Sequence, residues 1–156
     1  MSGVRYVVPK NRLTELLREP GGLPVAEALE RAQANLETLR PSCREELLAL
    51  LGVAEAAYEN LGTQSDAAGL SELYNLAVRG IGAGAVSGSP GVDEGLTSLC
   101  DLLDAMLSRG AYDREAIGVN LQAWRLLMTP DLPDEGARAI LQGLRKVSAR
   151  YAGAAA

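Results

Sequence analysis

Apolar residues recur at steps of four and three residues along most of this chain. Steps of this kind place apolar side chains on one face of an α-helix and polar side chains on the opposite face. Pro24 suits a first helical turn, whereas Pro41 is expected to end the helix, because proline has no backbone N–H for the helix interior. The stretch between them, PVAEALERAQANLETLR, carries one apolar stripe, made of Val25, Leu29, Ala32, Leu36 and Leu39.

A second helix is expected directly after Pro41. The stretch SCREELLALLGVAEAAYENLG starts with Ser42 and Glu45, whose spacing is that of a capping box. It closes with Gly62, at the position of a C-cap glycine. Residues at the same four- and three-residue steps should face the core: Leu47, Leu50, Ala54, Ala57 and Leu61.

Further helices follow in the same pattern. After a polar linker, residues 70–79 predict a third helix capped by Ser71, and residues 92–108 predict a fourth that Gly110 ends. Residues 113–128 predict a fifth helix. The last begins at Asp134 and has one apolar face, made of Ala137, Ile140, Leu141, Leu144, Val147 and Tyr151. The only competing strand pattern, RYVV at residues 5–8, is too short to form a sheet by itself.

These elements predict an all-α protein with a single helical domain over residues 1–156. We expect an N-terminal extension at 1–23, containing a helix or an extended segment, then a helical bundle at 24–151 and a frayed tail at 152–156. Alternating four- and three-residue steps are typical of helices that pack nearly antiparallel. The expected architecture is an antiparallel four-helix bundle, with about five to seven helices in total and four long ones at its centre.

The composition narrows the class of partner. The chain has 47% hydrophobic and 22% charged residues, as a globular domain does. Its net charge is −5 and its 15 basic residues are scattered, so we expect no nucleic-acid binding, which needs basic residues on one face. No apolar run is long enough to span a membrane, and the start of the chain lacks a secretory signal. We therefore expect no membrane association and a cytoplasmic location.

The sequence contains no histidine. This excludes histidine-based catalytic triads, metal sites with histidine ligands and phosphohistidine chemistry within the chain. Cys43 and Cys100 cannot complete a tetrahedral zinc site alone, and we expect them to be free thiols. Neighbouring carboxylates on the predicted helices fit a solvated face better than acid–base catalysis. We therefore expect no enzymatic activity, no cofactor and no metal.

One stretch departs from the helical pattern. LYNLAVRGIGAGAVSGSP, residues 73–90, starts as an amphipathic helix and then becomes rich in glycine, with Gly80, Gly82, Gly84 and Gly88. A phosphate-binding loop would need a lysine and a serine or threonine after its last glycine, but Ser89 and Pro90 follow here. A dinucleotide-binding fingerprint would need a preceding strand. The glycines instead indicate close packing, a break in the helix or access for a partner, and the residues alone do not decide among these.

The same stretch resembles the signature of histidine-containing phosphotransfer (Hpt) domains, four-helix bundles that relay phosphate between receiver domains. In Hpt-like chemotaxis proteins of the CheE type the pattern is Leu-Tyr-x-x-Ala-His-x-x-Lys-Gly-x-Gly, followed by Gly-Tyr-Pro and then Ser-Leu-Cys. This chain matches the pattern without a gap at Leu73, Tyr74, Ala77, Gly82, Gly84, Gly88, Pro90, Ser98, Leu99 and Cys100. PKNRL…PGGL and WRLLMTP…ILQGLRKV are also similar to that group, so the resemblance covers most of the chain.

The residues that would react are missing from this pattern. Val78 stands where the resemblance places the phosphorylated histidine, and Ile81 stands where it places the lysine. A second register, based on Arg79 and Gly80, puts Leu76 at the histidine position and keeps a basic residue after it. The first register is the one that continues without a gap into Ser-Leu-Cys. Neither valine nor leucine can accept or hold a phosphoryl group.

The resemblance implies a docking surface without a reacting group. In Hpt domains the histidine projects from the middle of a helix, and neighbouring glycines leave room for the loops of a receiver domain. We therefore expect a non-catalytic Hpt-like protein that binds a response-regulator receiver domain or a histidine kinase and modulates a phosphorelay. The residues expected at the contact are Val78, Arg79, Ile81, Gly82, Ala85, Asp93 and Glu94. The alternative is a purely structural or self-associating bundle, and homodimer formation stays open.

Overall fold

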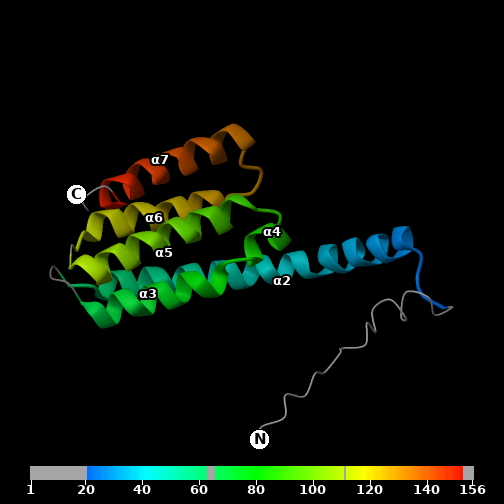
Figure 1. Cartoon of the computed structure of the whole chain (residues 1–156), viewed down its shortest axis with the longest axis horizontal. Coiled ribbons are helices and arrows are strands. Elements are labelled where there is room, and N and C mark those ends of the chain that lie inside the picture. The colour runs from blue at the N-terminus through cyan, green and yellow to red at the C-terminus, as the bar shows by residue number, and fades with distance from the viewer. Residues whose placement is uncertain (1–20, 63–65, 111, 153–156) are drawn as a thin grey trace, which may run out of the picture. The chain divides into compact units, whose positions relative to one another are not determined.

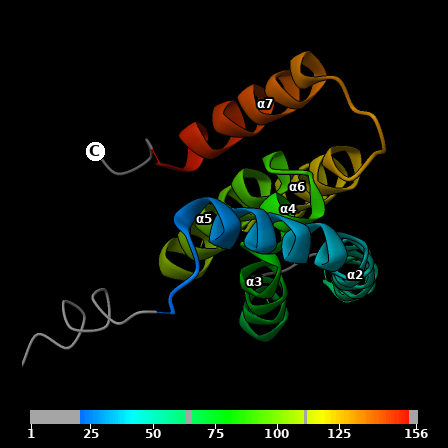
Figure 2. The same ribbon diagram turned by 90° about the vertical axis from the view of Figure 1, so that its right-hand side faces the viewer.

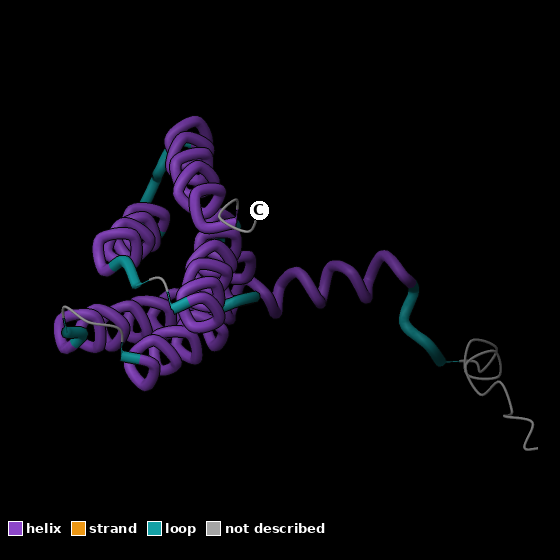
Figure 3. The backbone as a smooth tube through the Cα atoms, turned by 60° about the vertical axis from the view of Figure 1, so that its left-hand side comes forward, coloured by secondary structure: helices purple, strands orange, loops and turns teal. Residues whose placement is uncertain are grey.

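The protein is all-helical over the residues that the structure describes. The structure is a computed structural model, and it describes residues 21–62, 66–110 and 112–152. These ranges contain six helices and no strand: α2 (Val25–Asn60), α3 (Ala67–Gly80), α4 (Ala83–Ser87), α5 (Gly91–Arg109), α6 (Arg114–Leu127) and α7 (Asp134–Ala152). Figure 3 shows the helices joined by loops. The all-α class is confirmed, while the RYVV segment, the extension up to residue 20 and the tail from residue 153 lie outside the described residues.

The chain divides into two compact units, Met1–Asn35 and Leu36–Ala156. In the first unit the structure describes residues 21–35, which include the start of α2. The apolar side chains of this part are exposed, with 77% of Val25 and 64% of Leu29 accessible. The second unit contains the rest of α2 and all of the other helices. The prediction of one domain over the whole chain stays a prediction.

α2 is one continuous helix that passes through Pro41. The prediction that Pro41 ends a helix and that Ser42 and Glu45 cap a new one is therefore wrong. Proline removes one helical hydrogen bond and its ring crowds the preceding turn, but its fixed φ is itself helical. Leucine, glutamate and arginine, which are strong helix formers, dominate both flanks of Pro41. Their propensity and the burial of the later part of α2 offset the cost of the proline.

A leucine-rich core lies among the later part of α2 and helices α3, α5 and α6. Of the residues predicted to face inward after Pro41, Leu47, Leu50 and Ala54 are at most 4% exposed and Leu61 is 6% exposed. Ala57 is only partly buried against this core. Trp124 is 1% exposed and is the largest fully buried side chain of the described residues. The other large side chains that are fully buried are mostly leucines: Leu70, Leu73, Leu96, Leu99, Leu102 and Leu103, with Met106, Ile117 and Val92.

α5 is the central helix of the second unit. It packs against α3, α4, α6 and α7. The successive long helices of this unit run in alternating directions, as Figure 1 shows. α7 lies on the side of α5 and α6 opposite from α3 (Figure 2). This arrangement places the connection between α3 and α5, which contains the glycine-rich stretch and α4, next to the start of the central helix.

The helix ends follow ordinary capping chemistry, with one correction. α3 begins earlier than predicted, because the Asp66 side chain accepts a hydrogen bond from the N–H of Ala68, 3.1 Å away, and caps it. The prediction that Ser71 is the cap is wrong, since the alanines before it extend the helix. Gly110, with φ +67°, ends α5 as the sequence predicts. The Asp113 side chain caps α6, which begins at Arg114, one residue after the predicted start.

We expect Pro41→Ala to stabilise the protein by about 2 kcal/mol. Alanine is about 3 kcal/mol more favourable than proline in a helix interior, and the more flexible unfolded chain reduces this gain by about 1 kcal/mol. Urea unfolding followed by circular dichroism measures the change. Ser42→Ala is the matched variant: it should stabilise slightly within a continuous helix but destabilise by about 1 kcal/mol if Ser42 were a cap. Destabilisation by both changes would contradict a continuous α2.

Candidate functional site

The glycine-rich stretch forms two tight turns around the short helix α4. α3 ends at Gly80, α4 covers Ala83–Ser87 and α5 begins at Gly91. Gly82 precedes α4 with φ +94°, and Gly88 follows it with φ +84°. Both values lie in the left-handed region, which glycine enters without the steric cost that a Cβ imposes. These two glycines are therefore required by the path of the backbone.

Gly80 and Gly84 are required by close packing instead. A Cβ at Gly80 would lie 2.8 Å from a Leu96 methyl carbon and 3.3 Å from one of Leu47. A Cβ at Gly84 would lie 2.7 Å from an Asp93 carboxylate oxygen and 3.0 Å from the Asp93 backbone nitrogen. The groups that approach this backbone belong to α2 and α5 of the protein itself. Close packing and a break in the helix, two of the three explanations left open by the sequence, both apply.

The carboxylate of Asp93 occupies the start of α4. One of its oxygens accepts hydrogen bonds from the N–H groups of Gly82 (2.9 Å) and Gly84 (3.0 Å), and the other accepts from Ala85 (2.9 Å). N–H groups at the start of a helix attract an anion, and here the chain supplies that anion itself. These donors are therefore not free for a phosphate, and the Asp93 charge is not free for a partner.

Val78 and Ile81 lie on the surface. Val78 is 44% exposed in the last turn of α3, and Ile81 is 43% exposed directly after that helix. The position of Val78 differs from the mid-helix position that the resemblance implies, because the glycine-rich turn ends α3 at Gly80. Leu76 is 7% exposed and belongs to the core, so the second register would place the reacting position where no partner can reach it.

The remaining predicted contact residues divide between two places. Arg79 is exposed and its guanidinium lies 3.6 Å from a carboxylate oxygen of Glu46 on α2. Ala85 is exposed on α4. Glu94 is also exposed, but its carboxylate pairs with Arg145 of α7. We call Val78, Arg79, Ile81 and Ala85 the α3–α4 surface. Gly82 and Asp93 are joined by a hydrogen bond at the start of α4, and Glu94 pairs with Arg145 of α7.

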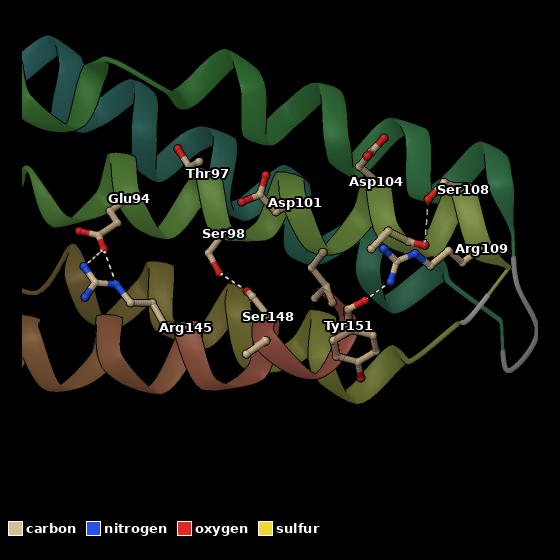
Figure 4. A pocket seen from close by; sticks show the side chains of 13 residues that line it. Glu94, Thr97, Ser98, Asp101, Asp104, Ser108, Arg109, Arg145, Ser148 and Tyr151 are labelled. Carbon is tan, nitrogen blue, oxygen red and sulfur yellow. Dashed lines mark hydrogen bonds and ion pairs between the residues drawn. The ribbon is translucent and has the colours of Figure 1, made fainter. Parts of the chain in front are cut away.

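A groove of about 530 Å³ lies between α5 and α7 (Figure 4). The sequence pattern does not predict it. Across the groove, Glu94 pairs with Arg145, and the hydroxyl groups of Ser98 and Ser148 lie 2.9 Å apart. At its other end the guanidinium of Arg109 donates to the backbone carbonyl of Tyr151. Most of its polar groups thus bind one another and hold α7 on α5. No sequence signal links residues this far apart in the chain.

The perturbed ionisable groups also have structural causes. Burial and the nearby charge of Asp101 raise the pKa of Cys100 to about 11, so its thiol is unreactive near neutral pH. The pKa of Tyr151 rises to about 12 because of burial and the hydrogen bond that its hydroxyl donates to Asp113. The same hydrogen bond is the largest cause of the lowered pKa of Asp113. None of these groups belongs to the α3–α4 surface.

The described residues contain neither a metal-binding cluster nor a membrane-spanning helix. Within residues 21–62, 66–110 and 112–152 no cluster of three or more cysteine, aspartate or glutamate side chains could hold a metal ion. No helix in the part of the chain that the structure describes is long and apolar enough to cross a membrane. Both Cys43 and Cys100 are free, as the sequence predicts.

Comparisons with known proteins identify no relative. No family model matches the chain, and neither a curated protein nor a solved structure shows a significant match. The resemblance to Hpt domains therefore depends on the motif around Leu73–Pro90 and on the weaker similarities at both ends. It stays a prediction.

Replacing Asp93 with alanine should destabilise the protein by about 2 kcal/mol. The variant loses three charge-assisted hydrogen bonds and leaves the N–H groups at the start of α4 without their acceptor. Glu94→Ala is the matched control, since it removes the same charge from the neighbouring residue but breaks only an exposed ion pair, worth under about 1 kcal/mol. Chemical unfolding measures both. Equal losses in the two variants would contradict the structural role of Asp93.

Proposed function

We propose that this protein is a non-catalytic Hpt-like binding module. It docks on a response-regulator receiver domain, or on a histidine kinase, and modulates a phosphorelay without passing phosphate. Its core is an antiparallel four-helix bundle formed by the later part of α2 with α3, α5 and α6. Two findings support this proposal: these helices share one hydrophobic core, and successive helices of this unit alternate in direction (Figure 1).

The observation that carries the proposal is the exposure of Val78 and Ile81. These two β-branched side chains stand at the histidine and lysine positions of the motif, and both leave more than two fifths of their surface in water. An exposed face of a helix that has no partner is usually polar. A docking surface that has lost its histidine and lysine would carry apolar side chains at these two positions. The burial of Leu76 supports the register that places Val78 at the centre.

Arg79 supplies the charge of this surface. Receiver domains bind Hpt domains through the loops around their phosphorylatable aspartate, where a positive charge is favourable. The ion pair between Arg79 and Glu46 has both side chains about three fifths exposed, so it contributes little stability and can be exchanged for a partner's carboxylate. Arg79 beside Val78 and Ile81 thus combines apolar contact with attraction to an acidic site.

The missing imidazole determines the outcome of such binding. No group on the α3–α4 surface can attack an aspartyl phosphate, because its side chains are aliphatic apart from the guanidinium of Arg79. The protein would occupy the receiver and compete with active phosphotransfer proteins. Small signalling interfaces bury less than about 1,200 Å², so a dissociation constant of about 1 μM to 1 mM is expected.

Titration of the full chain against a panel of purified receiver domains and kinase dimerisation domains tests the proposal. We expect saturable binding to at least one of them and a loss of at least tenfold in affinity for the double variant Val78→Glu, Ile81→Glu, because a buried, unpaired carboxylate disfavours the contact. Val119→Glu, on α6, is the matched control with 41% exposure. Absence of binding to every domain, or equal losses in variant and control, would reject the function.

Restoring the reacting groups gives a second test. The double variant Val78→His, Ile81→Lys should accept phosphate from a phosphorylated partner receiver at a slow but measurable rate. Phosphate-affinity gels detect the acid-labile product. Val119→His is the control, because it places an exposed imidazole away from the α3–α4 surface and should stay unmodified. A folded Val78→His, Ile81→Lys variant that binds the receiver but never becomes phosphorylated would contradict the proposed register.

A further inference from the structure

α7 is packed less deeply than the other long helices of the second unit. The contiguous hydrophobic core of the described residues is built from the later part of α2 and from α3, α5 and α6, with residues next to their ends. No residue of α7 belongs to it, and Leu144, 2% exposed, is the one buried side chain of this helix among the residues that the structure describes. The rest of its inward face is only partly buried against the core: Ala137, Ile140, Leu141, Val147 and Tyr151. α7 therefore covers a core that the other helices already form.

Two glycines of α5 close the contact with α6 without help from α7. A Cβ at Gly95 would lie 3.0 Å from a methyl carbon of Leu127 on α6, and a Cβ at Gly91 would lie 3.2 Å from the other methyl carbon of that leucine. The nearest atoms of α7 would be methyl carbons of Leu141, at 3.7 Å, and of Leu144, at 3.8 Å, which are ordinary van der Waals distances. The glycines thus serve the tight packing of α6 on α5. This packing does not need α7 in place.

Two polar contacts tie the middle of α7 to α5 (Figure 4). Arg145 pairs with Glu94, and the hydroxyl groups of Ser148 and Ser98 lie 2.9 Å apart. Both side chains of the ion pair are exposed, Arg145 to 70% and Glu94 to 46%, so the pair contributes little to stability. Beside these contacts the groove of about 530 Å³ leaves part of the space between the two helices unfilled. Water can replace such contacts at low cost when the helices separate.

Tyr151 makes the contacts at the other end of α7. Its backbone carbonyl accepts a hydrogen bond from the guanidinium of Arg109 on α5, and its hydroxyl donates one to the carboxylate of Asp113. Asp113 is the N-cap of α6 and also accepts a hydrogen bond from the N–H of Ala116, 3.0 Å away. Hydrogen bonds to a charged acceptor are stronger than those between neutral groups. The partly buried bond between Tyr151 and Asp113 is therefore the main latch of α7.

The connection between α6 and α7 allows α7 to move without the core. Its first residue is fixed, because the guanidinium of Arg44 on α2 donates to the carbonyl of Met128, 2.6 Å away. Residues 129–132 then line a cavity of about 300 Å³ together with residues 87–91. Asp131 has φ +56°, a left-handed conformation that is unfavourable for residues other than glycine. A change of backbone angles at residues 129–133 is therefore not opposed by close packing on every side.

We infer that α7 is a lid, which opens as one unit about residues 129–133 while the core stays folded. Opening breaks the polar contacts described above and moves Leu144 into water, but it leaves the contacts within the core in place. Partial openings of this kind have lower free energies than global unfolding. The closed lid covers one face of α5 and α6, so other molecules reach that face only in the minor open state. The lid does not involve the α3–α4 surface and does not depend on the proposed function.

Native-state hydrogen exchange of the full chain, followed residue by residue by NMR, tests the lid. We expect the amides of Leu141 and Val147 to share one protection factor, about 100-fold below that of α5 amides such as Leu99. Low concentrations of urea should change the α7 value little, because opening exposes little surface. An α7 that exchanges only together with α5 would overturn the inference. So would protection that falls steadily toward the end of α7, which is the pattern of a fraying helix.

Tyr151→Phe weakens the latch and keeps the aromatic ring. The closed state then loses one charge-assisted hydrogen bond relative to both the open and the unfolded state. We expect exchange of the α7 amides to become about tenfold faster, and exchange of the α5 amides to rise by the same factor. Unchanged α7 exchange in the folded variant would overturn the role of Tyr151 as the latch of the lid.

Tyr112→Phe is the matched control. It also removes one tyrosine hydroxyl, which donates to the carbonyl of Gly62 after the end of α2, 2.8 Å away. This bond is present in the closed and open states alike, so the α5 amides should exchange about threefold faster while the α7 amides keep their wild-type rate. Equal acceleration of α5 and α7 would mean that α7 opens only when the whole protein unfolds, and it would overturn the inference.

Discussion

Three backbone N–H groups, those of Gly82, Gly84 and Ala85, converge on the carboxylate of Asp93 and tie the start of α4 to the start of α5. This contact requires glycine at position 84, because a Cβ there would overlap with Asp93. It also holds the turn that follows Val78 and so determines where α3 ends. The orientation of Val78, Ile81 and Ala85 on the surface depends on it. A helix of one turn such as α4 could not remain in place by propensity alone.

The structural role of the glycines removes one argument that the Hpt-like motif offers for a docking surface. The resemblance implies that the glycines leave space for the loops of a partner. In the structure each glycine of the stretch has an internal cause, either a left-handed turn or a close contact. Their presence is therefore evidence for a particular turn rather than for docking. The case for a partner depends on the exposed apolar pair Val78 and Ile81 with Arg79 beside it. That pair has no structural role in the core. The α3–α4 surface is small and mixed, with aliphatic side chains beside one cation, which suits a transient contact with a partner.

The sequence by itself determined the helical class, the positions of α5, α6 and α7, the inward residues Leu47 and Leu50, and the absence of imidazole chemistry. These follow from the period of apolar residues, from the helix-ending Gly110 and from composition, all of which are local properties of the chain. Tertiary structure alone decided that α2 continues through Pro41, since packing and neighbouring propensity outweigh one lost hydrogen bond. It alone brought Asp93 to α4, Glu94 to Arg145 and Ser98 to Ser148, because contacts between different helices leave no periodic trace in the sequence.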